Sequence, residues 1–429
     1  GSTWSQTALN NKNVSSLAIS GNSIFAGISD YSNPSGVYLS TNNGTTWTQT
    51  ALNNKTVFSL AVSGNNIFAG TYDFYNSNGV FLSTNNGMTW TQTALNEIVV
   101  SLAISGNNIF AGCDYKKGVY LSTNNGQTWT QTALNNQNVR SLAVSGDNVF
   151  AGTDYGLYLS TNNGINWIQT ALNYHDVRSL AVSGNNIFAG TFSGVWHSTN
   201  NGQNWTQTAL NNKTVSSLAI NGYDIFAGTW NSGVYLSTNN GQTWAITTLN
   251  SETVYSIIIN GDNVFVGTFN GVYLSTNKGQ SWIQKNQGFI GFTTVQALII
   301  ANNYIFAGTS GHSVWRRSLS EIVGLQSIST KIPSAFSLGQ NYPNPFNPTT
   351  KIRFDVALSL SFPNVSIGNP VKLIVYDIMG RELQTLINES LKPGSYEVTF
   401  DASSFPSGIY FYSLESNKIK ITRKCILLK

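Results

Sequence analysis

The sequence predicts an all-β protein in which an eight-bladed β-propeller, closed by its N-terminal strand, precedes a small C-terminal β-sandwich. Three observations predict it: the chain of 429 residues repeats one unit with a period of 38 to 43 residues, short apolar segments alternate with Gly-rich turns inside each unit, and the repeat stops before the C-terminal part. A fixed period near 40 is typical of propellers and solenoids. With 9% charged and 12% aromatic residues, the composition is that of a packed β-repeat protein and not of a disordered chain.

The most regular part of the repeat is an eight-residue unit, Ser-Thr-Asn-Asn/Lys-Gly-x-x-Trp, of which residues 122–129 are one copy. Gly126 can adopt a positive φ angle, so the chain can reverse tightly there. The Ser and Asn side chains can hydrogen-bond to nearby backbone groups and hold the turn. We expect the tryptophan to anchor the following strand, so that Trp129→Ala lowers stability by about 3–5 kcal/mol. The seven complete copies end at Trp47, Trp90, Trp129, Trp167, Trp205, Trp244 and Trp282, and Trp4 ends a truncated copy.

Each repeat predicts four strands, which we name A to D. In the repeat of residues 139–172, strand A is 139–144, strand B 149–153, strand C 156–160 and strand D 167–172. A Gly-containing turn separates A from B, and the eight-residue unit separates C from D. Short strands with a turn signal between each pair are what a propeller blade requires.

The number of blades follows from strand A, which recurs eight times. The last strand C, residues 313–317, is followed by no eight-residue unit and no strand D, whereas residues 4–9 form a strand D without a blade of its own. The N-terminal strand therefore completes the eighth blade, which leaves no open sheet edge. Seven blades are the alternative. The strands A begin at Val14, Val57, Val99, Val139, Val177, Val215, Val254 and Val295.

The C-terminal part has a different composition. Residues 319–335 break the period and are predicted to be a linker between a propeller of residues 1–318 and a domain of residues 336–429. Three prolines follow at residues 343–348, and turn signals then separate alternating segments. We predict a β-sandwich with strands at 351–356, 371–377, 394–400, 408–414 and 418–428.

The eight-residue unit resembles the Asp-box, or BNR, repeat of sialidase-like β-propellers, Ser-x-Asp-x-Gly-x-x-Trp. This chain differs from that pattern by an Asn in place of the usual Asp. In that family the box is a fold element on the outside of a blade and not a catalytic site. The resemblance therefore implies that the seven tryptophans are structural.

The C-terminal segment resembles the type A sorting domain of type IX secretion cargo. The matching residues are 341–348, 375–381, 394–396, 406–412 and the ending 424–429. The resemblance implies that the type IX secretion machinery is a partner through residues 336–429. It also implies that the protein is extracellular or lies on the outer cell surface of a bacterium.

Charge and cysteine usage narrow the function classes. Residues 1–322 are electrically neutral and the net charge of +4 lies in the remainder, so nothing indicates nucleic-acid binding. No apolar run reaches the roughly 18 residues of a membrane span. Because the sequence starts inside a box without a signal peptide, we expect a mature or trimmed form. Cys113 and Cys425 fall in different predicted domains, which favours two lone cysteines over a disulfide.

Sialidase chemistry is disfavoured. Sialidases resemble one another in three arginines that hold a carboxylate, a Tyr–Glu pair and an acidic Asp, whereas the predicted propeller has few arginines and glutamates. Its histidines also lack the spacing of metal ligands. We therefore predict no catalytic residues, no cofactor and no metal site. The residues concerned are Arg140, Arg178, Arg316, Arg317, Glu97, Glu252, Glu321, His175, His197 and His312.

The B–C loops vary most between repeats, and we predict a ligand or partner face there. Aromatic rings beside Asn and Asp suit sugar rings or a protein partner. As alternatives, the rings fill space between blades and the Asp side chains cap loops. The aromatic candidates are Tyr31, Tyr72, Tyr115, Tyr155, Phe192, Trp230 and Phe269. The acidic candidates are Asp30, Asp73, Asp114 and Asp154, which are also the carboxylates that a glycosidase would need.

The sequence thus predicts a secreted or cell-surface propeller without enzymatic activity that serves binding or structural assembly. The neutral repeat opposes self-association only weakly, so a homopolymeric extracellular filament or coat is one form of structural assembly that we predict. The alternative is a carbohydrate-binding or glycosidase-like propeller. A glycan and a surface protein both stay open as partners.

Overall fold

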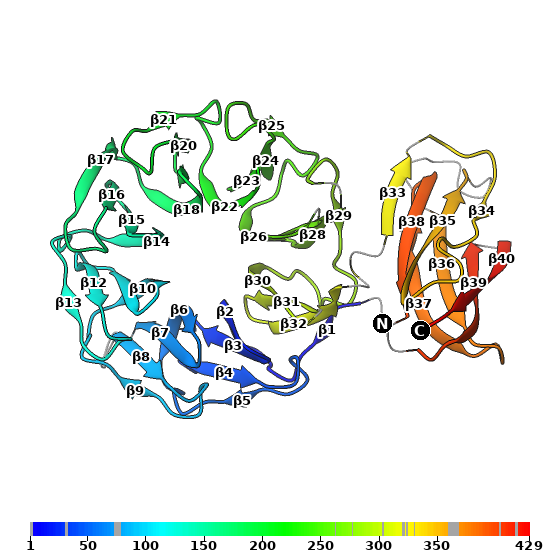
Figure 1. The fold of residues 1–429 in the computed structure, drawn as a ribbon, viewed down its shortest axis with the longest axis horizontal. Coiled ribbons are helices and arrows are strands. Elements are labelled where there is room, and N and C mark those ends of the chain that lie inside the picture. The colour runs from blue at the N-terminus through cyan, green and yellow to red at the C-terminus, as the bar shows by residue number, and fades with distance from the viewer. Residues whose placement is uncertain are drawn as a thin grey trace. The chain divides into compact units, whose positions relative to one another are not determined.

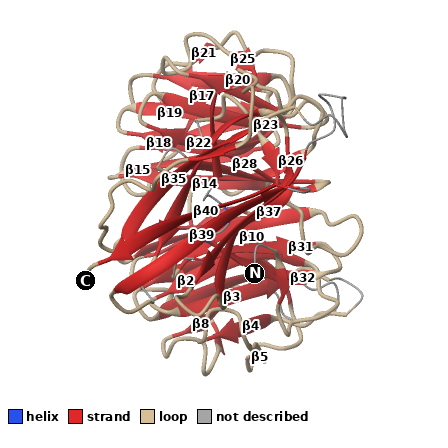
Figure 2. Ribbon diagram, turned by 90° about the vertical axis from the view of Figure 1, so that its right-hand side faces the viewer, coloured by secondary structure: helices blue, strands red, loops and turns tan. Residues whose placement is uncertain are grey.

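The computed structural model describes the chain apart from residues 1–2, 31–32, 73–78, 262, 277, 303, 320–321, 323–324, 330, 359–368, 403–404 and 417–418. All elements that it describes are β-strands (Figure 2). The chain divides into two compact units, one of residues 5–316 and one of residues 1–4 with 317–429. Among the described residues, no helix has the length and hydropathy needed to cross a membrane.

The first unit consists of eight four-stranded antiparallel sheets in the described part of the chain. Figure 1 shows these sheets following one another around a ring, with one strand of each sheet at the inner side. The inner strands are β2 (Val14–Ser20), β6 (Thr56–Ser63), β10 (Val99–Ser105), β14 (Val139–Ser145), β18 (Val177–Ser183), β22 (Val215–Asn221), β26 (Val254–Asn260) and β30 (Val295–Ala301).

The second strand of each sheet is an almost uninterrupted apolar run, and it is buried because neighbouring sheets cover both of its faces. These strands are β3 (Ser23–Ile28), β7 (Asn66–Tyr72), β11 (Asn108–Cys113), β15 (Asn148–Thr153), β19 (Asn186–Thr191), β23 (Asp224–Thr229), β27 (Asn263–Thr268) and β31 (Tyr304–Thr309). The third strands are β4 (Val37–Ser40), β8 (Gly79–Ser83), β12 (Gly118–Ser122), β16 (Gly156–Ser160), β20 (Gly194–Ser198), β24 (Val234–Ser237), β28 (Gly271–Ser275) and β32 (Ser313–Ser318).

The outer strands have two residues each, apart from β17 with six. They are β1 (Ser5–Gln6), β5 (Thr48–Gln49), β9 (Thr91–Gln92), β13 (Thr130–Gln131), β17 (Ile168–Asn173), β21 (Thr206–Gln207), β25 (Ala245–Ile246) and β29 (Ile283–Gln284). In seven sheets the outer strand follows the third strand directly along the chain, whereas the eighth sheet has the order β1-β32-β31-β30. There Ser5 pairs with Arg316 and Gln6 with Trp315, and the Thr7 amide donates to the Val314 carbonyl at 3.0 Å.

The apolar cores lie between successive sheets. Phe68 of one sheet packs against Val99 and Ile109 of the next, with Trp129 partly buried at the edge of the cluster. A corresponding cluster joins the sheet of Val14 to the last sheet through Phe306. Each sheet therefore gains its hydrophobic stabilisation from its neighbours, as expected of repeats that cannot bury their faces alone.

The eight-residue turn is held by the bonds that its residue types predict. The Ser122 hydroxyl accepts from the Gly126 amide at 2.8 Å, and the Asn124 carboxamide oxygen accepts from the Thr128 amide at 2.9 Å. The Asn oxygen thus takes the acceptor role that a carboxylate would have. Trp129 is half-buried and its indole N–H donates to the Gly126 carbonyl at 3.2 Å. Because the tryptophan is only half-buried, its truncation removes less apolar contact than we expected from the sequence.

In its described residues the second unit contains two four-stranded sheets, with strand orders β33-β38-β35-β34 and β37-β36-β39-β40. One buried core includes apolar side chains of both sheets, among them Phe354, Val398, Leu373 and Tyr412. The unit is therefore a β-sandwich. Its strands are β33 (Leu325–Ser329), β34 (Ser337–Leu338), β35 (Thr349–Val356), β36 (Asn369–Tyr376), β37 (Glu382–Leu391), β38 (Gly394–Asp401), β39 (Gly408–Ser416) and β40 (Ile419–Leu427).

Residues 319–335, which we expected to be a linker, contain strand β33. This strand pairs with β38 and places Leu325 in the sandwich core at 3% exposure. Burial of Leu325 and pairing with β38 explain why the segment is ordered as a strand. The predicted linker thus contributes an edge strand to the second unit.

The segment 341–348 is fixed against the end of the sandwich. The Asn344 side chain accepts from the Ile426 amide at 3.0 Å, and the Phe346 amide donates to the Ile426 carbonyl at 2.9 Å. The Tyr412 hydroxyl accepts from the Asn341 amide at 2.8 Å and donates to the Gly339 carbonyl at 2.9 Å. The proline-containing segment and the C-terminal ending therefore form one structural feature.

Candidate functional site on the B–C loop face

The loops of the first unit fall at two ends of each sheet. Because the strands are antiparallel, the A–B turns and the eight-residue turns share one end, which we call the A–B face, and the B–C loops and D–A connections share the other, which we call the B–C face. Backbone bonds tie the B–C loops to the connections: the Trp230 amide donates to the Thr214 carbonyl at 3.0 Å, and the Gly233 amide donates to the Glu252 carbonyl at 2.8 Å. Side chains on this face are thus held by a bonded loop network.

Five of the predicted aromatic residues are exposed on the B–C face in five successive sheets. Their side chains are between 47% and 61% exposed, which is far above the burial of a core ring. The exposed residues are Tyr115, Tyr155, Phe192, Trp230 and Phe269.

The remaining two aromatic candidates do not extend this row. Tyr72 ends strand β7, is 7% exposed and lies edge-on to Phe58 at 5.8 Å between ring centroids. Phe58 lies on β6 and Tyr72 on β7 of the same sheet, so this contact is within one sheet and does not test whether the rings fill space between blades. Tyr31 lies outside the described residues, as does the acidic candidate Asp73.

Asp114 and Asp154 come together through Arg140. The guanidinium bonds to Asp154 at 2.6 and 3.0 Å and to Asp114 at 3.2 Å, which joins the loops of two successive sheets. Burial raises the pKa of Asp154, but the hydrogen bonds from Arg140 and Asn138 and the charge of Arg140 outweigh it and hold the pKa below its usual range. Asp30 accepts from the Asn33 amide at 3.3 Å, as a loop-capping Asp does.

A second arginine organises the neighbouring part of the row. The Arg178 guanidinium carbon lies 4.2 Å from the centroid of Phe192 and 5.4 Å from that of Trp230, and its Nε bonds to Asp176 at 3.2 Å. Cation–π contacts of this kind stabilise by about 0.5–2 kcal/mol. They fix two of the exposed rings relative to each other.

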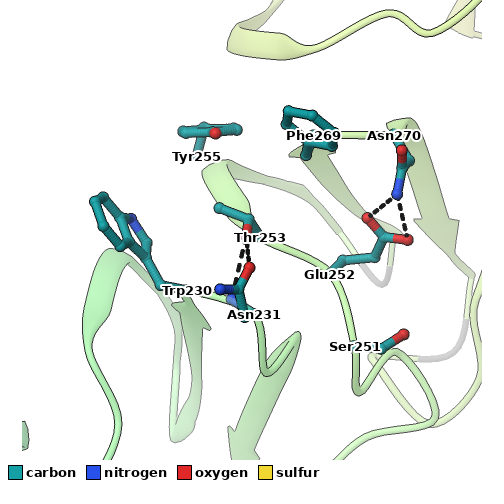
Figure 3. Close-up of a pocket in the computed structure, with 8 residues that line it drawn as sticks. All are labelled: Trp230, Asn231, Ser251, Glu252, Thr253, Tyr255, Phe269 and Asn270. Carbon is teal, nitrogen blue, oxygen red and sulfur yellow. Dashed lines mark hydrogen bonds between the residues drawn. The ribbon is translucent and has the colours of Figure 1, made fainter.

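A cleft of about 460 Å³ lies beside Trp230 on the same face. Figure 3 shows Trp230, Tyr255 and Phe269 around its mouth and Glu252 bonded to Asn270 at one side. The other lining residues are Asn231, Ser251 and Thr253. The cleft joins the B–C loops of two successive sheets.

Glu252 is the one charged residue among those that line the cleft. It is 9% exposed, and its carboxylate accepts from Asn270 Nδ2 at 3.0 and 3.2 Å and from the Tyr273 hydroxyl at 3.0 Å. Burial and the neighbouring Glu252 carboxylate raise the pKa of Tyr273 to about 12, so the phenol stays a donor. The carboxylate is therefore fixed by neutral donors.

Sequence reasoning missed Glu252 and Tyr255 as members of this face. A signal was present in the comparison between repeats. Glu252 stands in a D–A connection where three other repeats have Lys12, Lys55 and Lys213, and Tyr255 stands where two other strands A have Arg178 and Ser216. Among the described residues no group of three His, Cys, Asp or Glu gathers around a common point that could hold a metal.

Solved structures similar to this chain are β-propellers. The computationally designed protein Ika8 matches with a TM-score of 0.62 and 13% identity, over 73% of this chain and 98% of that one. Sqt1 of Saccharomyces cerevisiae matches with a TM-score of 0.54 and 12% identity, over 74% and 98%. BamB of Moraxella catarrhalis matches with a TM-score of 0.53 and 15% identity, over 74% and 100%. At these identities the likeness shows the fold alone.

A comparison with curated proteins finds none that matches this sequence. The family model of the secretion system C-terminal sorting domain matches residues 340–428, which are the larger part of the β-sandwich. A type IX sorting domain of this kind is handled by the type IX secretion system. Residues 340–428 thus belong to the secretion system C-terminal sorting domains, and the protein that carries them on a propeller is secreted or displayed at the cell surface.

Proposed function

We propose that the first unit is an eight-bladed propeller of the Asp-box type whose ring is closed by the N-terminal strand. Three observations support this: the eight similar sheets, the pairing of Ser5 with Arg316, and the Phe306 cluster that packs the last sheet against the first. The Ser122–Asn124 bonds of the eight-residue turn support the Asp-box assignment. A closed ring leaves only short outer strands as exposed sheet edges, and short edge strands resist edge-to-edge aggregation outside the cell.

We further propose that the protein is a non-enzymatic extracellular binding module whose B–C face is the recognition surface. The observation that carries this proposal is the row of five exposed aromatic side chains in successive sheets. Large rings that are about half exposed gain contact area on binding at little entropic cost, and they are enriched where proteins recognise partners.

The contacts of the carboxylates favour binding over hydrolysis. A glycosidase needs one carboxylic acid that can donate a proton and a second carboxylate that faces the bond. Asp114 and Asp154 are instead ion-paired with Arg140, and this pairing helps to hold the pKa of Asp154 below its usual range. Glu252 is saturated by Asn270 and Tyr273. Catalysis by these carboxylates would first have to break these ion pairs and hydrogen bonds.

An array experiment tests this function. The intact chain is applied to immobilised polysaccharides, glycoproteins and unglycosylated proteins, beside a variant in which Tyr155, Phe192 and Trp230 are changed to Ala. We expect the variant to lose binding. The matched control changes Tyr223 and Ile165, which are 75% and 65% exposed on the A–B face, and should bind as the intact chain does.

Two results would contradict the proposal. Equal binding by the B–C face variant and the intact chain would remove this face as the recognition surface. Release of reducing sugar from any polysaccharide by the intact chain, and not by a heat-denatured sample, would show enzymatic activity.

Self-assembly is the second candidate function. The A–B face also carries exposed apolar side chains, namely Met88 at 70%, Ile165 at 65% and Tyr223 at 75%. Two different faces with exposed apolar groups permit a heterologous contact between successive molecules, and such contacts propagate when they do not close. The electrical neutrality of residues 1–322 opposes this contact only weakly.

A further inference from the structure

We propose that the cleft between Trp230 and Phe269 is a binding site for a neutral sugar residue of an extracellular glycan. This inference rests on the proposed binding function and names its ligand class.

The shape and the rings of the cleft suit a pyranose. A cleft of about 460 Å³ lies within the range of about 300–1,000 Å³ that is usual for small-molecule sites. Trp230 and Phe269 are 47% and 53% exposed, and half-buried Tyr255 lies between them at the mouth (Figure 3). Arg178 already covers the Trp230 ring from one side, which leaves the remaining ring surface to a ligand. A sugar presents C–H groups to such rings and hydroxyl groups to their surroundings.

The polar groups of the cleft are held in place before any ligand binds. The Thr253 hydroxyl donates to Asn231 Oδ1 at 2.6 Å and accepts from the Asn231 amide at 3.2 Å. The Asn270 amide donates to the Thr268 hydroxyl at 3.0 Å, while its side chain is fixed by Glu252. A site with fixed side chains loses little conformational entropy on binding.

Several donors and acceptors of the lining have no protein partner within the described part of the chain. They are Asn231 Nδ2, the Ser251 hydroxyl and the Tyr255 hydroxyl. Asn231 and Ser251 are solvent-exposed and Tyr255 is half-buried, so these groups can reach a ligand in the cleft. Neutral donors and acceptors beside apolar rings match the alternating hydroxyl and C–H surface of a sugar.

The charge of the cleft selects against acidic sugars. Glu252 is the one charged group among the lining residues and is bonded to neutral donors, so the site presents a fixed negative charge. Arg178 contacts the Trp230 ring and is ion-paired with Asp176, and it is not among the residues that line the cleft. A uronate or sialate would place a second carboxylate in a cleft whose one charged lining residue is Glu252, which is unfavourable. We therefore infer a neutral sugar.

The test uses the intact chain and defined oligosaccharides. Neutral probes are hexamers of glucose, mannose and galactose; acidic probes are oligouronates and a sialylated trisaccharide; tetramethylammonium is the probe for a cation held by the three rings. Binding is measured by calorimetry, and saturation-transfer NMR identifies the sugar protons that touch the protein. We expect at least one neutral hexamer to bind and the acidic probes to bind at least about tenfold more weakly.

Three variants assign the site. Trp230→Ala should weaken binding of the neutral hexamer by about tenfold or more, as truncation of a central contact typically does. Tyr223→Ala, in an A–B turn off the recognition surface and 75% exposed, is the matched control and should change the affinity by less than about twofold. Glu252→Gln should narrow the gap between neutral and acidic probes, because it removes the charge and keeps an acceptor oxygen.

The outcomes separate this inference from the proposed function. Preference for acidic sugars, binding of tetramethylammonium alone, or equal loss in the Trp230 and Tyr223 variants would overturn the neutral-sugar site. If no sugar binds but the B–C face variant loses binding to an arrayed protein, the sugar site is wrong and the binding function stands. If the B–C face variant loses nothing on any arrayed ligand, the binding function itself is wrong.

Discussion

Gly126 of the third eight-residue turn meets two constraints, and a pair of alanine variants separates them. Its φ angle is +80°, and a Cβ atom placed on it would lie 2.7 Å from Cε1 of Phe68, a fully buried ring of the preceding sheet. Gly146, in an A–B turn, has a φ of +59° and nothing within 4 Å of a Cβ atom. Gly146→Ala therefore measures the backbone strain alone, and Gly126→Ala measures the strain and the inter-sheet contact together.

The expected magnitudes follow from these two contributions. A left-handed conformation costs an L-residue about 1–2 kcal/mol, and the loss of glycine's freedom in the unfolded chain returns about 0.4–1 kcal/mol. Gly146→Ala should therefore destabilise by roughly 1 kcal/mol. The clash with Phe68 adds about 1–3 kcal/mol, as overpacking of a dense core does. Gly126→Ala should then destabilise by about 2–4 kcal/mol.

Tryptophan fluorescence during urea unfolding is the assay, because ten of the 11 tryptophans lie in the unit of residues 5–316 and residues 317–429 contain none. Apart from the contribution of Trp4, the signal reports on the propeller repeats. The double variant with Phe68→Leu should recover part of the additional loss, since the shorter side chain relieves the contact. Equal midpoint shifts for Gly126→Ala and Gly146→Ala would refute the inter-sheet contact as the reason for this glycine.

Three further predictions use other parts of the chain. Trp129→Ala should destabilise by about 1.5–3 kcal/mol in the same assay, which is less than the about 3–5 kcal/mol typical of a buried ring. Its binding on the array should be unchanged, and a selective loss of binding would contradict a structural role. Burial raises the pKa of Glu397, but hydrogen bonds and charges from Lys351 and Arg353 lower it overall. The ionised group therefore stabilises the sandwich above its unfolded pKa, and this stabilisation is lost as the pH falls through the folded pKa. Between pH 6 and pH 3.5, the hydrogen-exchange protection of strand β38 should change less in Glu397→Gln than in the intact chain, and an identical change would argue against the ion pairs. Light scattering at high concentration should detect self-association of the intact chain and weaker self-association after deletion of residues 319–429. This deletion removes strand β33 together with the rest of its sheet. A strictly monomeric intact chain would contradict the assembly hypothesis.

The repeat made the strands of the first unit predictable almost to the residue. In the fourth repeat, strand C was expected at 156–160 and β16 spans Gly156–Ser160, while strand B was expected at 149–153 and β15 spans Asn148–Thr153. Such precision arises because each turn signal recurs many times, so one ambiguous residue in a single copy does not shift a boundary. The strand D predicted at 4–9 is too long, since β1 keeps only Ser5–Gln6, whereas the strand D predicted at 167–172 closely matches β17, Ile168–Asn173.

The sandwich was less predictable because its strands do not repeat. Strand β33 was assigned to a linker, and β37, residues Glu382–Leu391, was not predicted. The sequence of β37 is rich in Glu, Gln and Asn, which have low strand propensity, and two register shifts interrupt its pairing with β36. Pairing with a neighbouring strand overrides local propensity there, and this information is not local in the sequence.

The candidate site was half predictable for a related reason. The aromatic residues of the B–C loops stand out when repeats are compared, so Phe192, Trp230 and Phe269 were found. Glu252 was noticed only as one of few glutamates, because its neighbour Asn270 belongs to the next repeat and its position depends on how successive sheets pack. Contacts between repeats depend on how successive sheets pack around the ring, so comparing the sequence of one repeat with that of another does not reveal them.

The packing between sheets also explains why variation gathers on one face. On the A–B face, Gly126 fits against Phe68 of the preceding sheet, so a larger residue there displaces a neighbour's core. On the B–C face, about half of the surface of Tyr115 and of Trp230 is exposed to solvent. Their replacement therefore does not displace a buried core side chain of a neighbouring sheet. A repeat protein can therefore keep one face for its turns and change the other for its ligand. The cleft at Glu252 follows from this asymmetry, because it forms where two differing B–C loops meet.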